Sequence, residues 1–355
     1  MKRTETRPIH VGSVQIGGQN RCVLQSMTNV PVKDTEASVR QILELEERGC
    51  EVIRVAVLDE EDSHSIAALK KQIHIPVVAD IHFNYLLALN ALEQGVDAIR
   101  INPGNIGDRS HTEAVVRSCK EHHVPIRIGI NSGSLEKRLI ETYGGPCAEA
   151  MVDSARAHVN ILEELDFHDI CLSFKSSNVA LTIAAYEAAS KAFPYPLHLG
   201  VTEAGGFTGS AVKSSAALGT LLHEGIGDTI RISVSGPPKE ELIIGKQLLN
   251  CFGLYDNVPD LIACPTCGRI QYNMLPIVKE IEEYLTTIHE GITVAVMGCP
   301  VNGIQEAGRA DVGIAGSKDG GILFRHGEIV RQIPQEELVS CLKQEIQAIL
   351  AERHA

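Results

Sequence analysis

Eight apolar, β-rich runs separated by segments of helical period constrain the fold of this chain more than any other feature. The runs begin near residues 22, 51, 75, 98, 125, 169, 196 and 229, and amphipathic segments such as 34–49 and 110–123 lie between them. Continuous apolar strands that alternate with amphipathic helices indicate a parallel sheet covered by helices. Eight such units in about 230 residues predict an α/β fold with a (β/α)8 TIM barrel, and a doubly wound open sheet is the alternative.

The pattern changes after about residue 250. Residues 237–253 predict the eighth barrel helix, and the polar, Pro-containing passage 255–265 marks a boundary. A helix over 275–290, a strand over 292–299, a Gly-rich loop, a hairpin over 320–334 and a final helix from about Glu336 are predicted to follow. We therefore expect two domains: a TIM barrel over residues 1–257, preceded by a hairpin within 11–20, and a small α+β domain over 258–355.

Composition excludes several classes of protein. The 355 residues include 32 Lys and Arg against 45 Asp and Glu, which gives a formal net charge of −13, and they include no Trp. An acidic chain with few aromatic residues lacks the basic, stacking surface that binds nucleic acids. No apolar run approaches the length of a membrane span, and the first residues lack the apolar core of a signal peptide. These properties predict a cytoplasmic protein.

Four predicted strands carry an arginine between apolar residues: Arg54, Arg100, Arg127 and Arg231. Alternate residues of a barrel strand point inward, so these side chains are expected to face the barrel axis, with Lys175 as a fifth cation. Burying an unpaired arginine costs several kcal/mol, so either four separate ion pairs or a shared anion must compensate. Matching positions in four strands favour a polyanion, and a diphosphate fits the arginine forks.

Polar residues follow the strands at the C-terminal ends, where barrels keep their active sites. They are Asp80, His82, Asn102, Asn131, Glu203 and Ser233. Glu203 adjoins a pair of glycines and is the candidate acid or base, whereas Asp80 and His82 belong either to the site or to a structural network. A Schiff base on Lys175, as in an aldolase, is an alternative chemistry.

Three of the ten cysteines lie in contexts that suggest ligation. Cys264 and Cys267 form a CPTC pair, and Cys299 begins the sequence CPVNG. Three thiolates suit a [4Fe–4S] cluster, which usually has four protein ligands, and Glu306 is the nearest carboxylate that could be the fourth. A zinc site is the alternative, although it would favour a second Cys or His pair.

The residues by themselves predict an enzyme that binds a diphosphate in a barrel and reduces it with an iron–sulfur cluster on a separate domain. Three alternatives stay open at this point. One is a dehydratase with a cluster that does not change its redox state, and the second is a barrel aldolase or isomerase with a structural zinc domain. The third is a non-enzymatic iron–sulfur sensor or carrier, which would leave five barrel cations without a purpose.

Seven motifs follow one another along the chain: QSMTN, VADIHF, INPGN, LHLGVTEAGG, GIGDTIRIS, ACPTCGR and GCPVNG. In this order they resemble the family of bacterial 4-hydroxy-3-methylbut-2-en-1-yl diphosphate synthases over nearly the whole chain. The resemblance implies a TIM barrel like that of dihydropteroate synthase and a C-terminal domain like part of sulfite and nitrite reductases. It also implies a cytoplasmic homodimer in which the cluster domain of one chain covers the barrel of the other.

The activity implied by the resemblance is the conversion of 2-C-methyl-D-erythritol 2,4-cyclodiphosphate to (E)-4-hydroxy-3-methylbut-2-en-1-yl diphosphate, late in the non-mevalonate pathway of isoprenoid biosynthesis. Reduced flavodoxin or ferredoxin supplies two electrons in this family.

The family's site residues map onto this chain position by position. The [4Fe–4S] ligands would be Cys264, Cys267, Cys299 and Glu306. The substrate would be bound by Arg54, Arg100, Asn102, Arg127, Asn131, Lys175, Arg231 and Ser233, and the catalytic residues would be Glu203, Asp80 and His82. One departure concerns the loop before Glu306, where the family often reads NGPGEA and this chain reads NGIQEA. Loss of the Pro-Gly pair changes the preferred backbone conformation of that loop.

Overall fold

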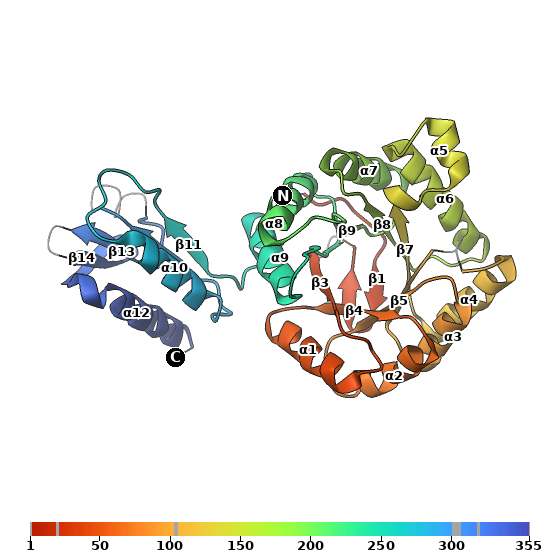
Figure 1. Ribbon diagram of the computed structural model, residues 1–355, viewed down its shortest axis with the longest axis horizontal. Helices are drawn as coiled ribbons and strands as arrows, with labels where there is room; N and C mark the ends of the chain where they lie inside the picture. Colours follow the sequence, from red (N-terminus) through yellow and green to blue (C-terminus); the bar gives the residue numbers. More distant parts are fainter. Residues whose placement is uncertain (1, 19–20, 103–105, 300–306, 318–319, 355) are drawn as a thin grey trace. The chain divides into compact units, whose positions relative to one another are not determined.

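Eight parallel strands form the barrel that the sequence predicts, and Figure 1 shows them inside a ring of helices. The strands are β3 (Val23–Met27), β4 (Val52–Val57), β5 (Val77–Ile81), β6 (Ala98–Ile101), β7 (Ile126–Asn131), β8 (Ile170–Lys175), β9 (His198–Leu199) and β10 (Thr229–Ile230). Their order is β8-β7-β6-β5-β4-β3-β10-β9, and a parallel bridge between Leu172 and Leu197 joins β8 to β9. The TIM barrel is confirmed, and the doubly wound sheet is wrong.

This computed structural model describes residues 2–18, 21–102, 106–299, 307–317 and 320–354. The chain divides into two units, Met1–Leu254 and Tyr255–Ala355. The sequence predicts the same order of domains, with the division after residue 257.

Nine helices belong to the described part of the barrel unit, and polar side chains fix where several of them begin. The helices are α1 (Thr35–Glu47), α2 (Glu60–Lys70), α3 (Tyr85–Glu93), α4 (Arg109–His122), α5 (Lys137–Tyr143), α6 (Ala148–Glu164), α7 (Val179–Ala192), α8 (Phe207–His223) and α9 (Lys239–Cys251). Asp34, Asp59, Asn84, Asp108 and Asn178 each cap a helix by accepting a backbone N–H of its first turn. Such caps satisfy N–H groups that have no partner within the helix. They therefore set the point at which each strand-to-helix loop ends.

The predicted N-terminal hairpin is confirmed as β1 (Ile9–Val11) and β2 (Val14–Ile16). Its apolar residues pack against one residue near the start of each of several barrel strands, namely Val23, Val52, Val78, Ala98 and Cys171. The hairpin therefore covers the N-terminal end of the barrel with hydrophobic side chains. Because apolar side chains cover the N-terminal end, the C-terminal end is where the polar residues of a site can be reached from solvent.

The second unit contains a five-stranded sheet in the order β11-β12-β13-β14-β15. Its strands are β11 (Asp260–Ala263), β12 (Thr293–Met297), β13 (Val312–Ser317), β14 (Gly320–Arg325) and β15 (Glu328–Ile333). Two helices, α10 (Met274–Leu285) and α12 (Leu338–Arg353), pack on it through residues such as Ile281, Leu342 and Ile346. β11, β12 and β13 are parallel, whereas β14 and β15 form the predicted hairpin.

Two strands of this sheet were not predicted. β11 lies in the polar passage assigned to the domain boundary, and β13 lies in the segment interpreted as a Gly-rich loop. The glycines of β13 serve packing: a Cβ atom at Gly313 would lie 2.4 Å from the Phe324 ring, and one at Gly316 would lie 2.7 Å from Tyr272. These glycines leave room for large aromatic neighbours. Because they replace the β-branched residues typical of strands, the sequence does not predict a strand here.

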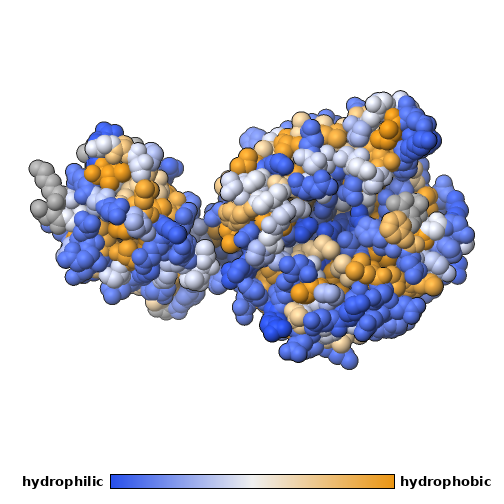
Figure 2. Space-filling model, in the orientation of Figure 1, coloured by the Kyte–Doolittle hydropathy of each residue, from blue (hydrophilic) through white to orange (hydrophobic). Residues whose placement is uncertain are grey.

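Hydrophilic residues cover much of the visible surface of both units, as Figure 2 shows. Among the described residues, no helix is long and apolar enough to cross a membrane.

Candidate active site at the barrel mouth and a cysteine site

The strand register places the predicted cations inside the barrel. Arg100 pairs in register with Asp80 on one side and with Arg127 on the other, so their side chains share a face of the sheet. Arg54, Arg100, Arg127 and Lys175 are all at most 9% exposed. Gly129 makes room for one of them, because a Cβ atom there would lie 2.4 Å from Nη2 of Arg100. Burial of cations in neighbouring strands is what the sequence predicts.

Asp80 is the carboxylate that two of these arginines share. Its oxygens lie 3.7 Å from Nε of Arg54 and 3.3 Å from Nη1 of Arg100. Nη1 of Arg100 also donates to Nε2 of His82 at 2.9 Å, and Nε of Arg54 contacts Sδ of Met27 at 3.1 Å. Burial by itself would raise the pKa of Asp80, but His82 and the two arginines outweigh it and lower that pKa well below its usual range. Asp80 is therefore an ionised partner of the arginines and not a proton donor.

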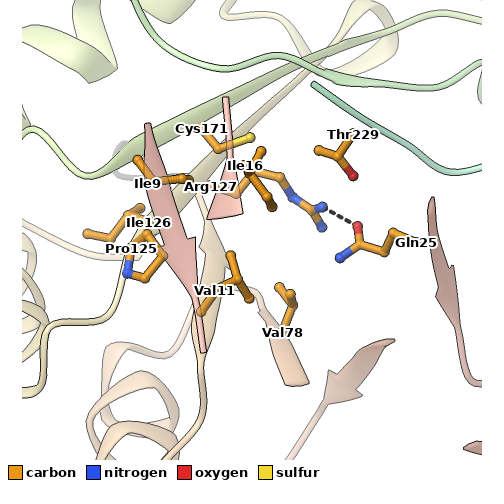
Figure 3. A pocket seen from close by; sticks show the side chains of 11 residues that line it. Ile9, Val11, Ile16, Gln25, Val78, Pro125, Ile126, Arg127, Cys171 and Thr229 are labelled. Carbon is orange, nitrogen blue, oxygen red and sulfur yellow. Dashed lines mark hydrogen bonds between the residues drawn. The ribbon is translucent and has the colours of Figure 1, made fainter. Parts of the chain in front are cut away.

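Arg127 is held from the opposite side of the barrel. Its Nη1 donates to Oε1 of Gln25 at 2.6 Å, as Figure 3 shows. Its Nε and Nη2 are buried and have no hydrogen-bond partner among the described residues. Arg127 also lines a small cavity towards the N-terminal hairpin, whose other walls include Ile16 and Cys171. Burial lowers the pKa of Arg127. Two free donors on a buried cation are what an anion-binding arginine requires.

Arg231 differs from the other three arginines. Its Nε and Nη2 donate to the two carboxylate oxygens of Glu241 at 3.0 and 2.5 Å, and its Nη1 donates to Ser233 at 3.3 Å. Glu241 comes from α9 and was not predicted as a site residue. The sequence leaves an ion pair or a shared anion open for each of the four arginines, and the structure gives Arg231 an ion pair with a buried carboxylate.

Lys175 is buried, with only 9% of its surface exposed. Even so, it has no carboxylate, hydroxyl or carbonyl partner within the described residues. Its pKa lies well below the usual value because of burial first and then the charges of Arg54, Arg231, Arg127 and Arg100. Burial and nearby arginines also lower the pKa of Arg54, to about 9. In the described part of the mouth, five basic side chains thus have only Asp80 and Glu241 as carboxylate partners. The site has an excess of positive charge that an anion would compensate.

The remaining predicted residues lie at the strand ends. Asn131 pairs in register with Lys175, and Oδ1 of Asn102 is buried without a partner within the described range. Glu203 is exposed and has φ of +54°. A left-handed backbone at a residue other than Gly is uncommon and costs of order 1 kcal/mol, and such strain concentrates at functional sites. The backbone of Glu203 is consistent with a functional role for its carboxylate.

Four polar residues inside or against the barrel were missed by the sequence analysis: Gln25, Ser26, His198 and Glu241. His198 is fully buried and lies in register with Thr229, on the inward face of the strands. Burial and the charges of Arg127 and Lys175 lower its pKa well below the usual value, so its imidazole is neutral. Period-two alternation could have identified His198, because it lies between two leucines of a predicted strand, whereas Gln25 is followed by the polar Ser26 and gives no such signal.

The three candidate ligand cysteines lie near the ends of two neighbouring parallel strands of the second unit. Cys264 follows β11, Cys267 lies in the turn after it, and Cys299 follows β12. The backbone N–H of Gly298 donates to Sγ of Cys264 at 3.2 Å. The backbone N–H of Arg269 and then its guanidinium group lower the pKa of the exposed Cys267 thiol. All ten cysteines of the chain are unpaired.

This donor set fits an iron–sulfur cluster in its chemistry. Three reduced thiols lie near one end of one sheet, and one of them, Cys267, receives N–H groups that lower its pKa and favour the thiolate form. Within the described residues, no three His, Cys, Asp or Glu side chains are close enough together to bind a metal ion. Glu306, the predicted fourth ligand, lies outside the described residues.

Two family models match the chain: the GcpE TIM-barrel domain over residues 6–246 and the GcpE protein C-terminal domain over residues 260–348. A Bacillus mycoides (strain KBAB4) protein named 4-hydroxy-3-methylbut-2-en-1-yl diphosphate synthase (flavodoxin) is 54% identical over 354 residues, which cover 100% of this chain and 97% of the relative. A Bacillus anthracis protein of the same name is 55% identical over 353 residues, or 99% and 96% of the two chains.

Solved structures confirm the barrel fold. The 7,8-dihydropteroate synthase of Vibrio fischeri ES114 matches with a TM-score of 0.51 at 13% identity, over 70% of this chain and 98% of that chain. A truncated 3-deoxy-D-arabino-heptulosonate 7-phosphate synthase of Thermotoga maritima matches with a TM-score of 0.50 at 16% identity, over 71% and 95%. At these identities the likeness shows the fold alone. The two family models and the full-length relatives together show that this chain belongs to the GcpE family.

Proposed function

We propose that this protein is a 4-hydroxy-3-methylbut-2-en-1-yl diphosphate synthase. It would open the ring of 2-C-methyl-D-erythritol 2,4-cyclodiphosphate and remove one of its oxygens reductively. The excess of buried positive charge inside the barrel is the observation that carries this proposal, because two nitrogens of Arg127 lack protein acceptors and the buried Lys175 has no carboxylate partner within the described residues. A cyclic diphosphate supplies acceptor oxygens for such a site. Relatives at 54% and 55% identity have this activity in their names.

In this proposal the basic side chains bind the diphosphate and fix its orientation. Arg127 offers two free N–H donors, and the ammonium group of Lys175 pairs with a phosphate oxygen. Arg54 and Arg100, already positioned by Asp80, face the same region. Asn102, Asn131 and Ser233 would add hydrogen bonds at the strand ends. Holding the substrate in one orientation can contribute a large share of the rate enhancement.

Glu203 is the residue that we assign to proton transfer. The departing oxygen leaves as water, which requires two electrons and a proton donor near that oxygen. Glu203 is exposed at a strand end, so it can exchange protons with solvent between turnovers. Asp80 stays ionised, and its role would be to orient Arg54, Arg100 and His82.

Cys264, Cys267 and Cys299 would hold a [4Fe–4S] cluster, with Glu306 as the fourth ligand. Such a cluster supplies single electrons and a Lewis-acidic iron when it is bound. Flavodoxin, which the relatives' names give, is the proposed donor, and ferredoxin is the alternative. We place the enzyme in the cytoplasm.

A homodimer belongs to the same proposal. The cluster unit of one copy would cover the barrel mouth of the other, because two large apolar side chains are exposed where strands end. Leu58 follows β4 and is 75% exposed, and Phe83 follows β5 and is 76% exposed. A covering unit would bury them.

The test is anaerobic purification, reconstitution with iron and sulfide, and assay of the cyclodiphosphate with reduced flavodoxin. We expect about four irons per chain, a visible absorption band that bleaches on reduction, and formation of the linear diphosphate. One tightly bound zinc, without a visible band or turnover, would instead favour an aldolase or isomerase that uses Lys175.

A further inference from the structure

Glu241 is a buried carboxylate that reaches the barrel mouth from outside the strands. It is 2% exposed and lies in the first turn of α9. Its Oε1 accepts from Nη2 of Arg231 at 2.5 Å, and its Oε2 accepts from Nε of Arg231 at 3.0 Å. Oε2 also accepts from the hydroxyl of Ser26 at 2.9 Å. Three hydrogen bonds and the N-terminal end of the helix dipole compensate the cost of burying this charge.

The position of Glu241 coincides with the seam that closes the barrel. The first and last strands of the barrel, β3 and β10, pair through only two residues each: Val23 with Thr229 and Leu24 with Ile230. Beyond these pairs, Ser26 of β3 and Arg231 after β10 are joined through the carboxylate of Glu241. A side-chain bridge therefore continues the seam to the end where the substrate is proposed to bind.

The bridge also fixes the direction of the guanidinium group. Glu241 occupies Nε and Nη2, so Nη1 is the nitrogen that remains, and it contacts Ser233 at 3.3 Å. Arg231 and Ser233 are both assigned to the diphosphate in the proposed function. A bidentate carboxylate leaves an arginine little freedom to rotate. A free Arg231 would have to lose that freedom on each binding event.

We propose that Glu241 is a positioning residue for substrate binding, which holds Arg231 with one edge directed to Ser233 and the diphosphate. This inference rests on the proposed function. Glu241 lies on α9, outside the ring of strands, and would join the residues that determine affinity for the substrate. Ser26 would assist by fixing the second carboxylate oxygen.

The test uses the reconstituted holoenzyme and four variants: Glu241→Gln, Arg231→Ala, the double variant of these two, and Glu240→Gln as the control. Gln keeps the size of Glu241 but removes its charge and one acceptor for the guanidinium group. Glu240 is its neighbour in the same helical turn, and its carboxylate approaches Gly236 instead, 2.6 Å from where a Cβ atom would lie. Each variant is compared for KM, kcat, iron content and melting temperature.

We expect Glu241→Gln to raise the KM for the cyclodiphosphate about tenfold, with kcat within about twofold of wild type. Arg231→Ala should raise KM by about 30-fold or more, and adding Glu241→Gln to it should change KM less than about twofold. Glu240→Gln should behave as wild type. Equal iron contents and melting temperatures in the single Gln variants would exclude a general loss of structure.

Several results would overturn the inference while leaving the function intact. One is an unchanged KM in Glu241→Gln when Arg231→Ala raises it. Another is a full additional increase of KM in the double variant, because Glu241 would then act independently of Arg231. A third is an unchanged KM in Arg231→Ala. Failure of the function itself would be recognised separately, because the wild-type holoenzyme would not convert the cyclodiphosphate.

Discussion

The barrel mouth and the cysteine site differ in how many of their side chains are held in place by contacts with other protein groups. At the mouth, Asp80, Gln25 and Glu241 hold the arginines in fixed positions through bonds that the barrel provides. In the second unit, the three cysteines lie near the ends of neighbouring strands, but no three metal-binding side chains converge within the described residues.

The two sites are proposed to bind two kinds of ligand. A soluble substrate is bound and released in each turnover, so affinity increases when its partners are already oriented. A resident metal cluster contributes its own binding free energy to the structure around it. Substitutions at each site separate the two contributions.

The largest effect is expected from Cys264→Ser. Removal of this thiolate should abolish most of the reconstituted iron and nearly all of the activity, because the cluster would lose a ligand that the protein cannot replace. Iron analysis and the visible spectrum give the measurement. Cys251→Ser is the matched control, because Cys251 is an exposed cysteine at the end of α9 and should leave both values unchanged. Wild-type iron content in the Cys264 variant would show that the ligand is misassigned.

Glu203→Gln should lower kcat by about 10²- to 10⁴-fold, as expected for loss of a general acid. The visible and EPR spectra should stay the same, because Glu203 belongs to the barrel and not to the cysteine site. Steady-state rates with the cyclodiphosphate measure the effect. A fully active variant would remove Glu203 from the mechanism.

Arg127→Ala should raise KM for the cyclodiphosphate by about 10- to 100-fold, with a smaller change in kcat, because two charge-assisted hydrogen bonds would be lost. Kinetics at several substrate concentrations separate the two parameters. Gln25→Leu offers a milder comparison, since it frees Nη1 of Arg127 without removing the charge. Unchanged kinetic parameters in Arg127→Ala would place Arg127 outside the substrate site.

Lys175→Met should stabilise the ligand-free protein by about 1–3 kcal/mol while it weakens substrate binding, because it removes a buried cation without an acceptor. The folded-state pKa of Lys175 is below that of the unfolded chain, so the unfolded chain binds more protons between the two pKa values and wild-type stability rises with pH across that range. The stabilisation by Met should therefore be largest at low pH and decrease as pH rises. Thermal unfolding at several pH values measures it. Equal stability of both proteins at low pH would contradict the assignment of Lys175 as a buried, unpaired cation.

Patterns in the sequence are enough to predict the architecture of the barrel. Eight apolar runs at regular spacing predict eight βα units, and arginines in matching positions of four runs predict convergence, because strand period and barrel closure leave few other arrangements. Which groups hold those arginines depends on contacts that form in the folded chain. Gln25 lies 102 residues from Arg127 in the sequence, and Ser26 lies 215 residues from Glu241.

Such pairs depend on strand register and on the orientation of one helix against a seam, and neither leaves a local pattern in the sequence. The same reason applies to β13. Its glycines predict a loop from the sequence, whereas in the folded protein the rings of Phe324 and Tyr272 fill the space beside them. Local chemistry and periodicity set the elements of this protein, whereas contacts across long sequence separations set the positions of its functional side chains.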